Sequence, residues 1–309
     1  MSFDYNNPFY RSIGQEMNGT LTFRETFRVK LARKNIAMIA KTMQKFRGET
    51  MPLQIGIIPY CNAFPLIHYL SEYLPGAVIS EWLPATMQPQ IAQRKLDLAL
   101  MPVAELLFLP HSRIVSNCCI ACNGTVRSVL LICRKPIEQI RTISLDTASR
   151  SSVKVCELIL RYFYGIQPEQ HRLEQNQNPD DCRTDAFVII GDRALTYQPS
   201  DYWAYRYDIG ALWREKTGFP LVFAAWIGCT PQIEDQCLAE ALQAARDRGL
   251  QHIEAILDAK ERQGISLPLD RNHMLDYYRR AIVYTMEEPE QTGLQHFLDL
   301  AKLSGAEYG

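Results

Sequence analysis

Three polar segments of the chain contain side chains suited to bind and convert a small anionic molecule. In the first segment, Tyr60 and Asn62 follow an apolar run at residues 55–58 and precede a predicted helix. A phenol and an amide at the end of a buried strand can hydrogen-bond a ligand, because α/β proteins bind ligands at the carboxyl ends of their strands. These two side chains are therefore the first candidates for a binding or catalytic site.

The second segment is rich in hydroxyl groups and carries one cation. It spans residues 146–152, DTASRSS, and leads into a predicted helix. Backbone N–H groups, hydroxyls and the positive end of a helix dipole together bind anions, and a guanidinium adds a forked donor. The segment therefore suits a carboxylate, although serine and threonine are also good N-caps for structural reasons alone. Its candidate ligand-binding residues are Thr147, Ser149, Arg150, Ser151 and Ser152.

The third segment is a polar turn at residues 123–128, with Thr125 and Ser128 as candidate ligand-binding residues. It lies where we expect the chain to cross between two lobes. Clefts between domains are preferred ligand sites. Three polar segments that converge on one cleft favour a ligand more strongly than any of them does alone.

Other chemistries have weaker support in the sequence. Cys119 and Cys122 form a C-x-x-C pair, but they lie on a predicted strand, where positions three apart point to opposite faces. Cys61 is the tempting nucleophile, yet only the isolated His68 is near it in sequence. The chain has no G-x-S-x-G elbow, no G-x-G-x-x-G motif and no P-loop. We predict neither a metal nor any other cofactor.

Strand and helix patterns alternate from Met51 onward, which predicts an α/β fold. The runs at 186–190 and 221–228 are apolar throughout, as in strands that are buried on both faces. After Thr230 the pattern is helical, with helices expected at about 233–263, 271–287 and 290–303.

We expect two lobes with a cleft between them and a helical C-terminal segment. Residues 51–122 and 229–309 would form a discontinuous first lobe, and residues 123–228 the second. Residues 1–50 are a poorly patterned N-terminal extension whose second half is basic and amphipathic.

The composition argues against several classes of partner. The net charge is −1 over 309 residues, so nucleic acid and an anionic membrane surface are poor candidates. Nine cysteines without a disulfide framework fit free thiols in a reducing compartment. The N-terminus lacks the apolar core of a secretory signal, and no segment has the length of a transmembrane helix. We expect a cytoplasmic protein.

The ordered set of segments resembles the chorismate dehydratase family of the futalosine route to menaquinone. IPYCNAFPL is similar to the family's opening motif, S-Y-x-N-x-x-P-L, with Pro59 where serine is usual. LDLALMPVAE, NGTVRSVLL, SLDTASRSSV, DAFVIIGDRAL and YDIGALWREKTGFPLVFAAW resemble later segments of the family. The resemblance covers most of the chain from Met51. One departure is Val103, near which the family often carries a serine.

The resemblance implies a fold like that of type II periplasmic binding proteins and an enzyme that binds chorismate. The reaction would remove water to give 3-[(1-carboxyvinyl)oxy]benzoate. Asn62 would be the catalytic residue at the reacting end, and Tyr60 would help to shape the pocket. The hydroxyl-rich segments would hold the two carboxylates. Glu105 is the nearest acidic candidate for a base, but a position on a helix surface is expected for it.

Three rival hypotheses remain at this point. A solute-binding protein of the same fold would bind a small carboxylate without turnover, and it would normally carry a signal peptide or a lipoprotein cysteine. A 1,4-dihydroxy-6-naphthoate synthase of the same pathway would have a different opening motif. A sensor domain would need a DNA-binding module, for which residues 1–50 are too short. Fold alone does not decide between them.

Overall fold

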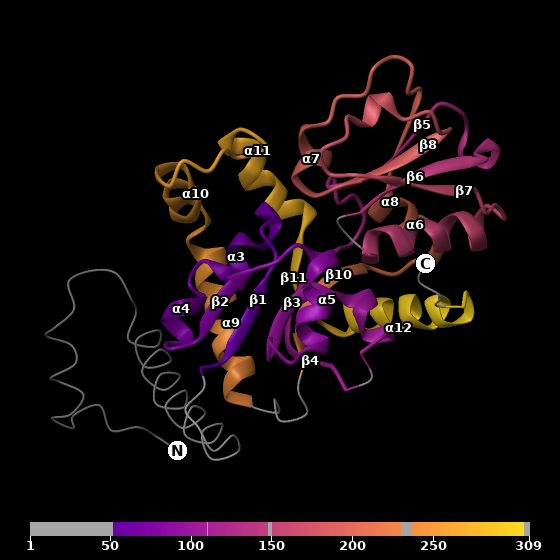
Figure 1. Ribbon diagram of the computed structural model, residues 1–309. Helices are drawn as coiled ribbons and strands as arrows, with labels where there is room; N and C mark the ends of the chain where they lie inside the picture. Colours follow the sequence, from indigo (N-terminus) through magenta and orange to yellow (C-terminus); the bar gives the residue numbers. More distant parts are fainter. Residues whose placement is uncertain (1–51, 110, 148–149, 230–235, 306–309) are drawn as a thin grey trace, which may run out of the picture.

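The computed structural model describes residues 52–109, 111–147, 150–229 and 236–305. The expected N-terminal extension therefore lies outside the described residues. The described strands form two sheets in two bodies that lie side by side, with the sheet A body at the lower left of Figure 1 and the sheet B body at the upper right. We call these bodies lobe A and lobe B. The predicted two-lobed α/β fold is confirmed.

Sheet A has six strands in the order β11–β4–β10–β3–β1–β2. The strands β1 and β2 pair in parallel, as do β1 and β3, whereas β10 and β11 run antiparallel to their neighbours. The bounds are β1 (Gln54–Ile57), β2 (Val78–Glu81), β3 (Leu98–Pro102), β4 (Arg113–Cys122), β10 (Leu221–Gly228) and β11 (Val283–Thr285).

Sheet B has five strands in the order β7–β6–β8–β5–β9. Strand β6 pairs in parallel with β7 and with the central strand β8, and β5 is antiparallel to β8 and β9. The bounds are β5 (Val129–Cys133), β6 (Thr142–Asp146), β7 (Glu169–Leu173), β8 (Ala186–Ile190) and β9 (Tyr205–Asp208).

Helices and short helical turns connect the strands and cover the sheets (Figure 1). In lobe A they are η1 (Cys61–Ala63), α3 (Phe64–Ile67), α4 (Leu70–Tyr73), α5 (Pro84–Ala92), η2 (Val103–Leu107), α9 (Gln236–Gln251), α10 (Ile253–Arg262), α11 (Arg271–Asp276), the π-helix η5 (Tyr277–Ala281) and α12 (Glu288–Leu303). In lobe B they are η3 (Ile137–Gln139), α6 (Arg150–Phe163), η4 (Pro179–Asp181), α7 (Gly191–Thr196) and α8 (Ile209–Thr217). No described helix combines the length and apolar character needed to cross a bilayer.

Strand β10 lies in sheet A, although the expected division put residues 221–228 in the second lobe. It pairs with β3 on one side and β4 on the other, so the chain returns to lobe A before this strand and not after it. Every residue of β10 is buried. An apolar run of this kind fits the middle of either sheet, and only its long-range pairing decides which one it joins.

The prediction that the chain is entirely helical after Thr230 is wrong, because a strand lies in this part. The expected helix at 271–287 consists of α11, one π-helical turn and the strand β11. Val283 and Thr285 of β11 pair with β4 at the edge of sheet A. A three-residue strand is too short to show a period of two, so the pattern gave no warning of it.

The apolar core is continuous across the two lobes. It fills sheet A and extends to one face of sheet B, while a smaller cluster covers the other face of sheet B. Alternate residues of β8 contribute to the two cores, with Val188 in the first and Ile189 in the second. Strand β8 is thus held from both sides, which fixes the position of the residues that follow it.

A close backbone contact positions the segment that follows Asn62. Helix α3 packs against α9, and a Cβ added at Gly249 of α9 would lie 1.9 Å from the carbonyl oxygen of Pro65. Because that atom belongs to the backbone, the contact requires glycine at 249. The start of α3, and with it the preceding turn, is thereby pressed onto the core.

Candidate functional site

The carboxyl ends of parallel strands from both sheets meet where the lobes join. Strands β1 and β3 of sheet A lead into η1 and η2, and strands β6 and β8 of sheet B lead toward α6 and α7. The turn η1 contacts α7, and η2 packs against α6. We call this region the lobe junction. It corresponds to the position at which α/β folds bind their ligands.

Tyr60 and Asn62 each carry a buried polar atom that has no hydrogen-bond partner in the described part of the chain. These atoms are the Tyr60 hydroxyl and the Asn62 Oδ1. Leaving such an atom without a partner costs about 1–3 kcal/mol. Both atoms belong to residues at or next to the short turn η1. The prediction that these two residues lie together at a strand end fits the structure.

The main chain of the same turn is held from two directions, and we call this arrangement the η1 clamp. The Cys61 N–H donates to the Asp192 carboxylate of α7, at 3.2 and 3.3 Å from its two oxygens. The hydroxyl of Tyr278 donates to the Cys61 carbonyl at 3.0 Å, and that of Tyr284 donates to the Asn62 carbonyl at 2.8 Å. Both tyrosines come from the C-terminal segment of lobe A.

Ser128 reaches the same region from the segment that crosses between the lobes. Its side chain is 2% exposed, and its Oγ accepts a hydrogen bond from the Tyr277 hydroxyl at 2.9 Å. The Asn62 side chain is a second hydrogen-bonding neighbour of that hydroxyl. Tyr277 begins the π-helical turn, a feature that often accompanies functional sites. Tyr277 therefore connects Ser128 to Asn62.

The crossing segment is fixed by one carboxylate. Asp208, the N-cap of α8, accepts the N–H groups of Val126 at 3.0 Å and Arg127 at 2.6 Å. These bonds shape the turn that presents Ser128 inward. The same turn leaves Thr125 exposed to solvent.

Arg150 and Ser151 bridge the lobes on the other side of the junction. The Arg150 Nη1 lies 3.2 Å from both Glu105 oxygens and 2.7 Å from the Gln88 Oε1. Ser151 Oγ accepts the Ala104 N–H at 3.0 Å, which leaves its own proton available to donate. The beginning of α6 is thus bound to η2.

Glu105 is not a surface residue, contrary to the expectation. Its side chain is 0% exposed because η2 follows the buried strand β3 and turns the residue toward lobe B. Burial raises the pKa of Glu105, and the pairing with Arg150 opposes that shift. Val103, which precedes it in η2, is also fully buried.

The remaining predicted residues lie in different environments. Ser152 is buried in α6. The Thr147 hydroxyl lies 3.4 Å from the Leu173 carbonyl and 3.4 Å from the Glu174 Oε2, so it faces the end of β7. Ser149 lies outside the described residues.

Two aspartates at the junction were missed by sequence reasoning. Asp146 ends β6 and is 1% exposed, with the Arg193 Nη1 3.6 Å from its Oδ2, and Asp192 follows β8. Burial raises the pKa of Tyr60, the charges of both aspartates raise it further, and Arg193 opposes them. The phenol of Tyr60 therefore lies within electrostatic range of both carboxylates. An acid directly after a buried apolar strand, in SLD and in IIGD, was the available signal.

Burial also controls the ionisation of Asp192 and Cys61. It raises the pKa of Asp192, although hydrogen bonds from Cys61 oppose the shift. The titratable groups that face this carboxylate are Tyr60, Cys61, Tyr277 and Tyr278. The pKa of the Cys61 thiol is raised well above its ordinary value by burial and by Asp192. The thiol is then protonated at neutral pH and is a poor nucleophile.

The described residues include no group of three His, Cys, Asp or Glu side chains arranged to hold a metal ion. The predicted C-x-x-C pair is buried, and burial raises the pKa of both the Cys119 and the Cys122 thiol. These thiols therefore resemble small apolar core residues more than metal ligands.

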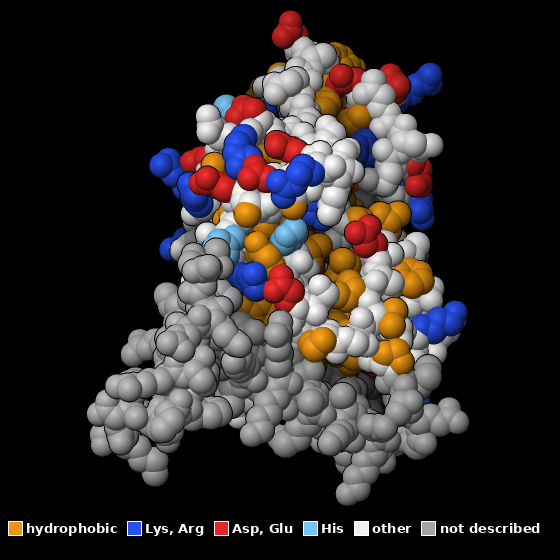
Figure 2. Space-filling view, turned by 90° about the vertical axis from the view of Figure 1, so that its left-hand side faces the viewer, with side chains coloured by type: hydrophobic (Ala, Val, Ile, Leu, Met, Phe, Trp, Pro, Cys, Tyr) orange, Lys and Arg blue, Asp and Glu red, His pale blue; other side chains and the backbone are white. Residues whose placement is uncertain are grey.

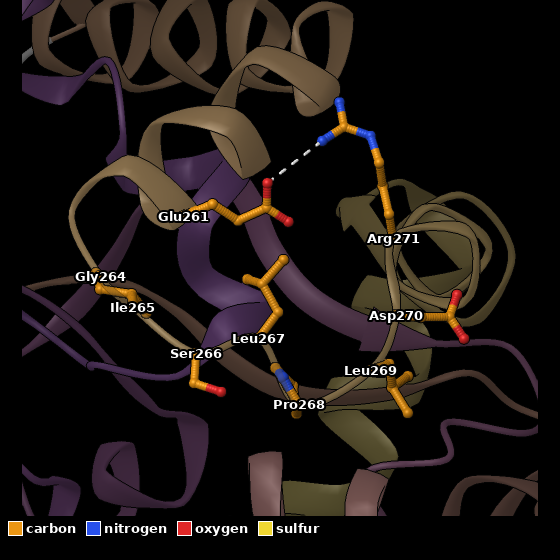
Figure 3. Close-up of a pocket in the computed structure, with 9 residues that line it drawn as sticks. All are labelled: Glu261, Gly264, Ile265, Ser266, Leu267, Pro268, Leu269, Asp270 and Arg271. Carbon is orange, nitrogen blue, oxygen red and sulfur yellow. Dashed lines mark ion pairs between the residues drawn. The ribbon is translucent and has the colours of Figure 1, made fainter.

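A separate hollow lies in lobe A, away from the predicted site residues. It has a volume of about 590 Å³ and is lined by residues of the α10–α11 connection, where Glu261 faces Arg271 at 3.9 Å (Figure 3). On the face shown in Figure 2, acidic and basic side chains are intermingled in the upper part and apolar side chains are more frequent below.

A family model described as menaquinone biosynthesis matches residues 53–303. This chain belongs to that family. A relative named chorismate dehydratase, from Thermus thermophilus, is 27% identical over 266 residues, which cover 80% of this chain and 94% of the relative. The family assignment agrees with the resemblance seen in the sequence motifs.

Solved structures support the fold. A protein of Archaeoglobus fulgidus aligns with a TM-score of 0.64 at 13% identity, covering 83% of this chain and 98% of that one. A Candida albicans protein described as exhibiting the generic periplasmic binding protein structural fold aligns with a TM-score of 0.53 at 11% identity, covering 84% and 92%. The chain has a periplasmic-binding-protein-like fold.

Proposed function

We propose that this protein is a chorismate dehydratase, a lyase that converts chorismate to 3-[(1-carboxyvinyl)oxy]benzoate and water. The observation that carries the proposal is the match to the Thermus thermophilus relative of that name, which extends over 94% of its length. The match to the menaquinone biosynthesis family over residues 53–303 agrees with it. All nine cysteines are free thiols, which supports a reducing compartment such as the cytoplasm.

The proposed reaction removes one proton and one hydroxyl group from neighbouring ring carbons. The C–H bond at the ether-bearing carbon breaks, its electron pair forms the new ring double bond, and the C–O bond to the neighbouring hydroxyl breaks. The departing oxygen takes up a proton and leaves as water. Because the product ring is aromatic, the enzyme mainly has to orient the substrate and exclude bulk water.

Asn62 is the proposed catalytic residue, with Tyr60 beside it. The buried Asn62 Oδ1 and Tyr60 hydroxyl have no hydrogen-bond partner in the described part of the chain. In this proposal they hydrogen-bond the leaving hydroxyl and the reacting end of chorismate. Donors and acceptors that are already in place act strongly in a site from which water is excluded.

The two carboxylates of chorismate are proposed to bind hydroxyl groups and the beginning of α6. Ser151 and Ser152 are buried there, and Ser151 has a proton to donate. Arg150 shares its charge with Glu105, so it contributes less to binding than an unpaired guanidinium would. Ser128 serves the second carboxylate, with Thr125, Thr147 and Ser149 as further candidates.

The test is incubation of the purified full-length protein with chorismate, with the product followed by mass spectrometry. We expect a product lighter than chorismate by one water, and a rate that falls about 10²–10³-fold in Asn62→Ala and Asn62→Asp. Asn123→Ala, which changes an exposed asparagine of the crossing segment, is the matched control and should keep the full rate. Tight binding of chorismate without turnover would favour a carboxylate-binding protein of the same fold. If the protein neither binds chorismate nor converts it, the assignment of the ligand is refuted.

A further inference from the structure

Asp192 holds the turn that carries Asn62, although the two residues belong to different lobes. Asp192 lies in α7 of lobe B, and its carboxylate accepts the Cys61 N–H of lobe A at 3.2 and 3.3 Å. The Tyr278 and Tyr284 hydroxyls hold the carbonyl groups of the same turn from the C-terminal segment. The turn is therefore fixed at its N–H by one lobe and at its carbonyls by the other.

Gly191 allows Asp192 to reach this position. It adopts a φ of +63°, and a Cβ added there would lie 3.2 Å from the ring of Tyr60. Its N–H donates to the Ser128 carbonyl at 2.8 Å. The first residue of α7 is thus packed directly against the site, and the next residue points its carboxylate at the η1 turn.

We propose that Asp192 is a positioning residue for the dehydration, which acts through the Cys61 N–H to set the orientation of the Asn62 side chain. The contact joins the lobes, so Asn62 is correctly oriented only when lobe B is seated on lobe A. The kinetic part of this inference rests on the proposed function, whereas the structural part does not.

A role as general acid makes a different prediction from a positioning role. An asparagine at 192 cannot transfer a proton, but its Oδ1 can still accept the Cys61 N–H. A positioning role therefore predicts that Asp192→Asn keeps most of the activity and that Asp192→Ala does not. A proton-transfer role predicts that both substitutions are equally damaging.

The experiment compares Asp192→Ala and Asp192→Asn with a matched control, Asp185→Asn. Asp185 lies at the opposite end of β8 and also accepts main-chain N–H groups, at 2.9 Å from Arg141 and 3.3 Å from Thr142. We expect Asp192→Ala to lower kcat about 10–100-fold with little change in KM, because misplacing a reacting group costs rate. Asp192→Asn should stay within about fivefold of wild type, because it retains the acceptor. Asp185→Asn should leave both constants unchanged.

Two further measurements keep the test independent of turnover and of folding. Hydrogen exchange at the Cys61 amide should accelerate at least about tenfold in Asp192→Ala and not in Asp185→Asn, because the amide loses its acceptor. Tyr278→Phe releases the turn from the other side and should also lower kcat selectively, even if Asp192→Ala does not fold. A wild-type kcat in Asp192→Ala, or an Asp192→Asn as inactive as Asp192→Ala, would overturn the inference. If the wild type does not dehydrate chorismate, the proposed function fails and the exchange measurement alone decides the structural part.

Discussion

Two aspartates flank strand β8, and their carboxylates lie in different environments. Asp185, just before the strand, accepts the N–H groups of Arg141 and Thr142 and lies 2.7 Å from the Lys135 Nζ. Asp192, just after the strand, accepts the Cys61 N–H across the lobe junction. Both satisfy main-chain donors, but only the second lies beside residues proposed to meet substrate.

The environments of the two carboxylates move their pKa values in opposite directions. At Asp185 burial acts upward, but hydrogen bonds from Lys135 and from the Arg141 N–H outweigh it and lower the pKa. At Asp192 burial outweighs the hydrogen bonds from Cys61 and raises the pKa. We therefore expect ionised Asp185 to stabilise the fold and ionised Asp192 to cost stability.

Among substitutions near the two ends of β8, we expect the largest effect on stability and activity at Gly191, beside Asp192. Gly191→Ala places a methyl group 3.2 Å from the Tyr60 ring and forces alanine to adopt a φ of +63°. We expect a loss of about 1–3 kcal/mol in the free energy of unfolding, measured by urea denaturation, and at least a tenfold loss of kcat/KM.

Gly218→Ala is the matched control for that substitution. Gly218 has a φ of +76°, but an added Cβ would have no neighbour within 4 Å. It should therefore show a loss of about 1 kcal/mol from the backbone strain and no loss of kcat/KM. Equal losses of activity in the two variants would contradict the claim that this end of β8 is built for the site.

A smaller effect is expected when each carboxylate is neutralised and unfolding is followed at pH 7. Asp185→Asn should lose about 1 kcal/mol, because a carboxylate with a lowered pKa stabilises the protein at pH values above the unfolded pKa. Asp192→Asn should be as stable as wild type or slightly more so, because it removes a carboxylate with a raised pKa. A clear destabilisation by Asp192→Asn would show that the carboxylate serves stability after all.

The smallest expected effect is the change with pH in the stability difference between wild type and each of these two variants. Asp185 keeps its advantage above its unfolded pKa of about 3.9, so the gap between wild type and Asp185→Asn should hold from pH 7 to about pH 5 and narrow as the pH falls below about 4. Any gain in Asp192→Asn should shrink at higher pH values than this, as the pH falls from 7 toward about 4, because the raised pKa of wild-type Asp192 lets it become neutral earlier. Thermal melts at pH 3, 4, 5 and 7 would measure both trends, and stability gaps of the same sign in the two variants would contradict the assignment of opposite pKa shifts.

Much of the architecture follows from local patterns. The alternation of apolar strands with helices predicted two α/β lobes, and the polar residues at strand ends predicted Tyr60, Asn62 and Ser128 near one another. These signals are local because a buried strand has to be apolar and its end has to be polar where a ligand binds.

What the sequence could not predict depends on long-range pairing. The apolar sequence of β10 would fit the middle of either sheet, and β11 is too short to show the alternation typical of a strand. Glu105 is buried beside Arg150, a partner 45 residues further along the chain. Asp192 acts on an amide that is 131 residues away in sequence. No spacing rule connects such partners, so the residues that hold the site were harder to find than those proposed to touch the substrate.

The decisive experiment is to incubate the full-length protein with chorismate and to measure the mass of the product. We expect complete conversion to a compound that has lost one water, at a rate that depends on Asn62. Unchanged chorismate in the presence of folded protein would contradict it.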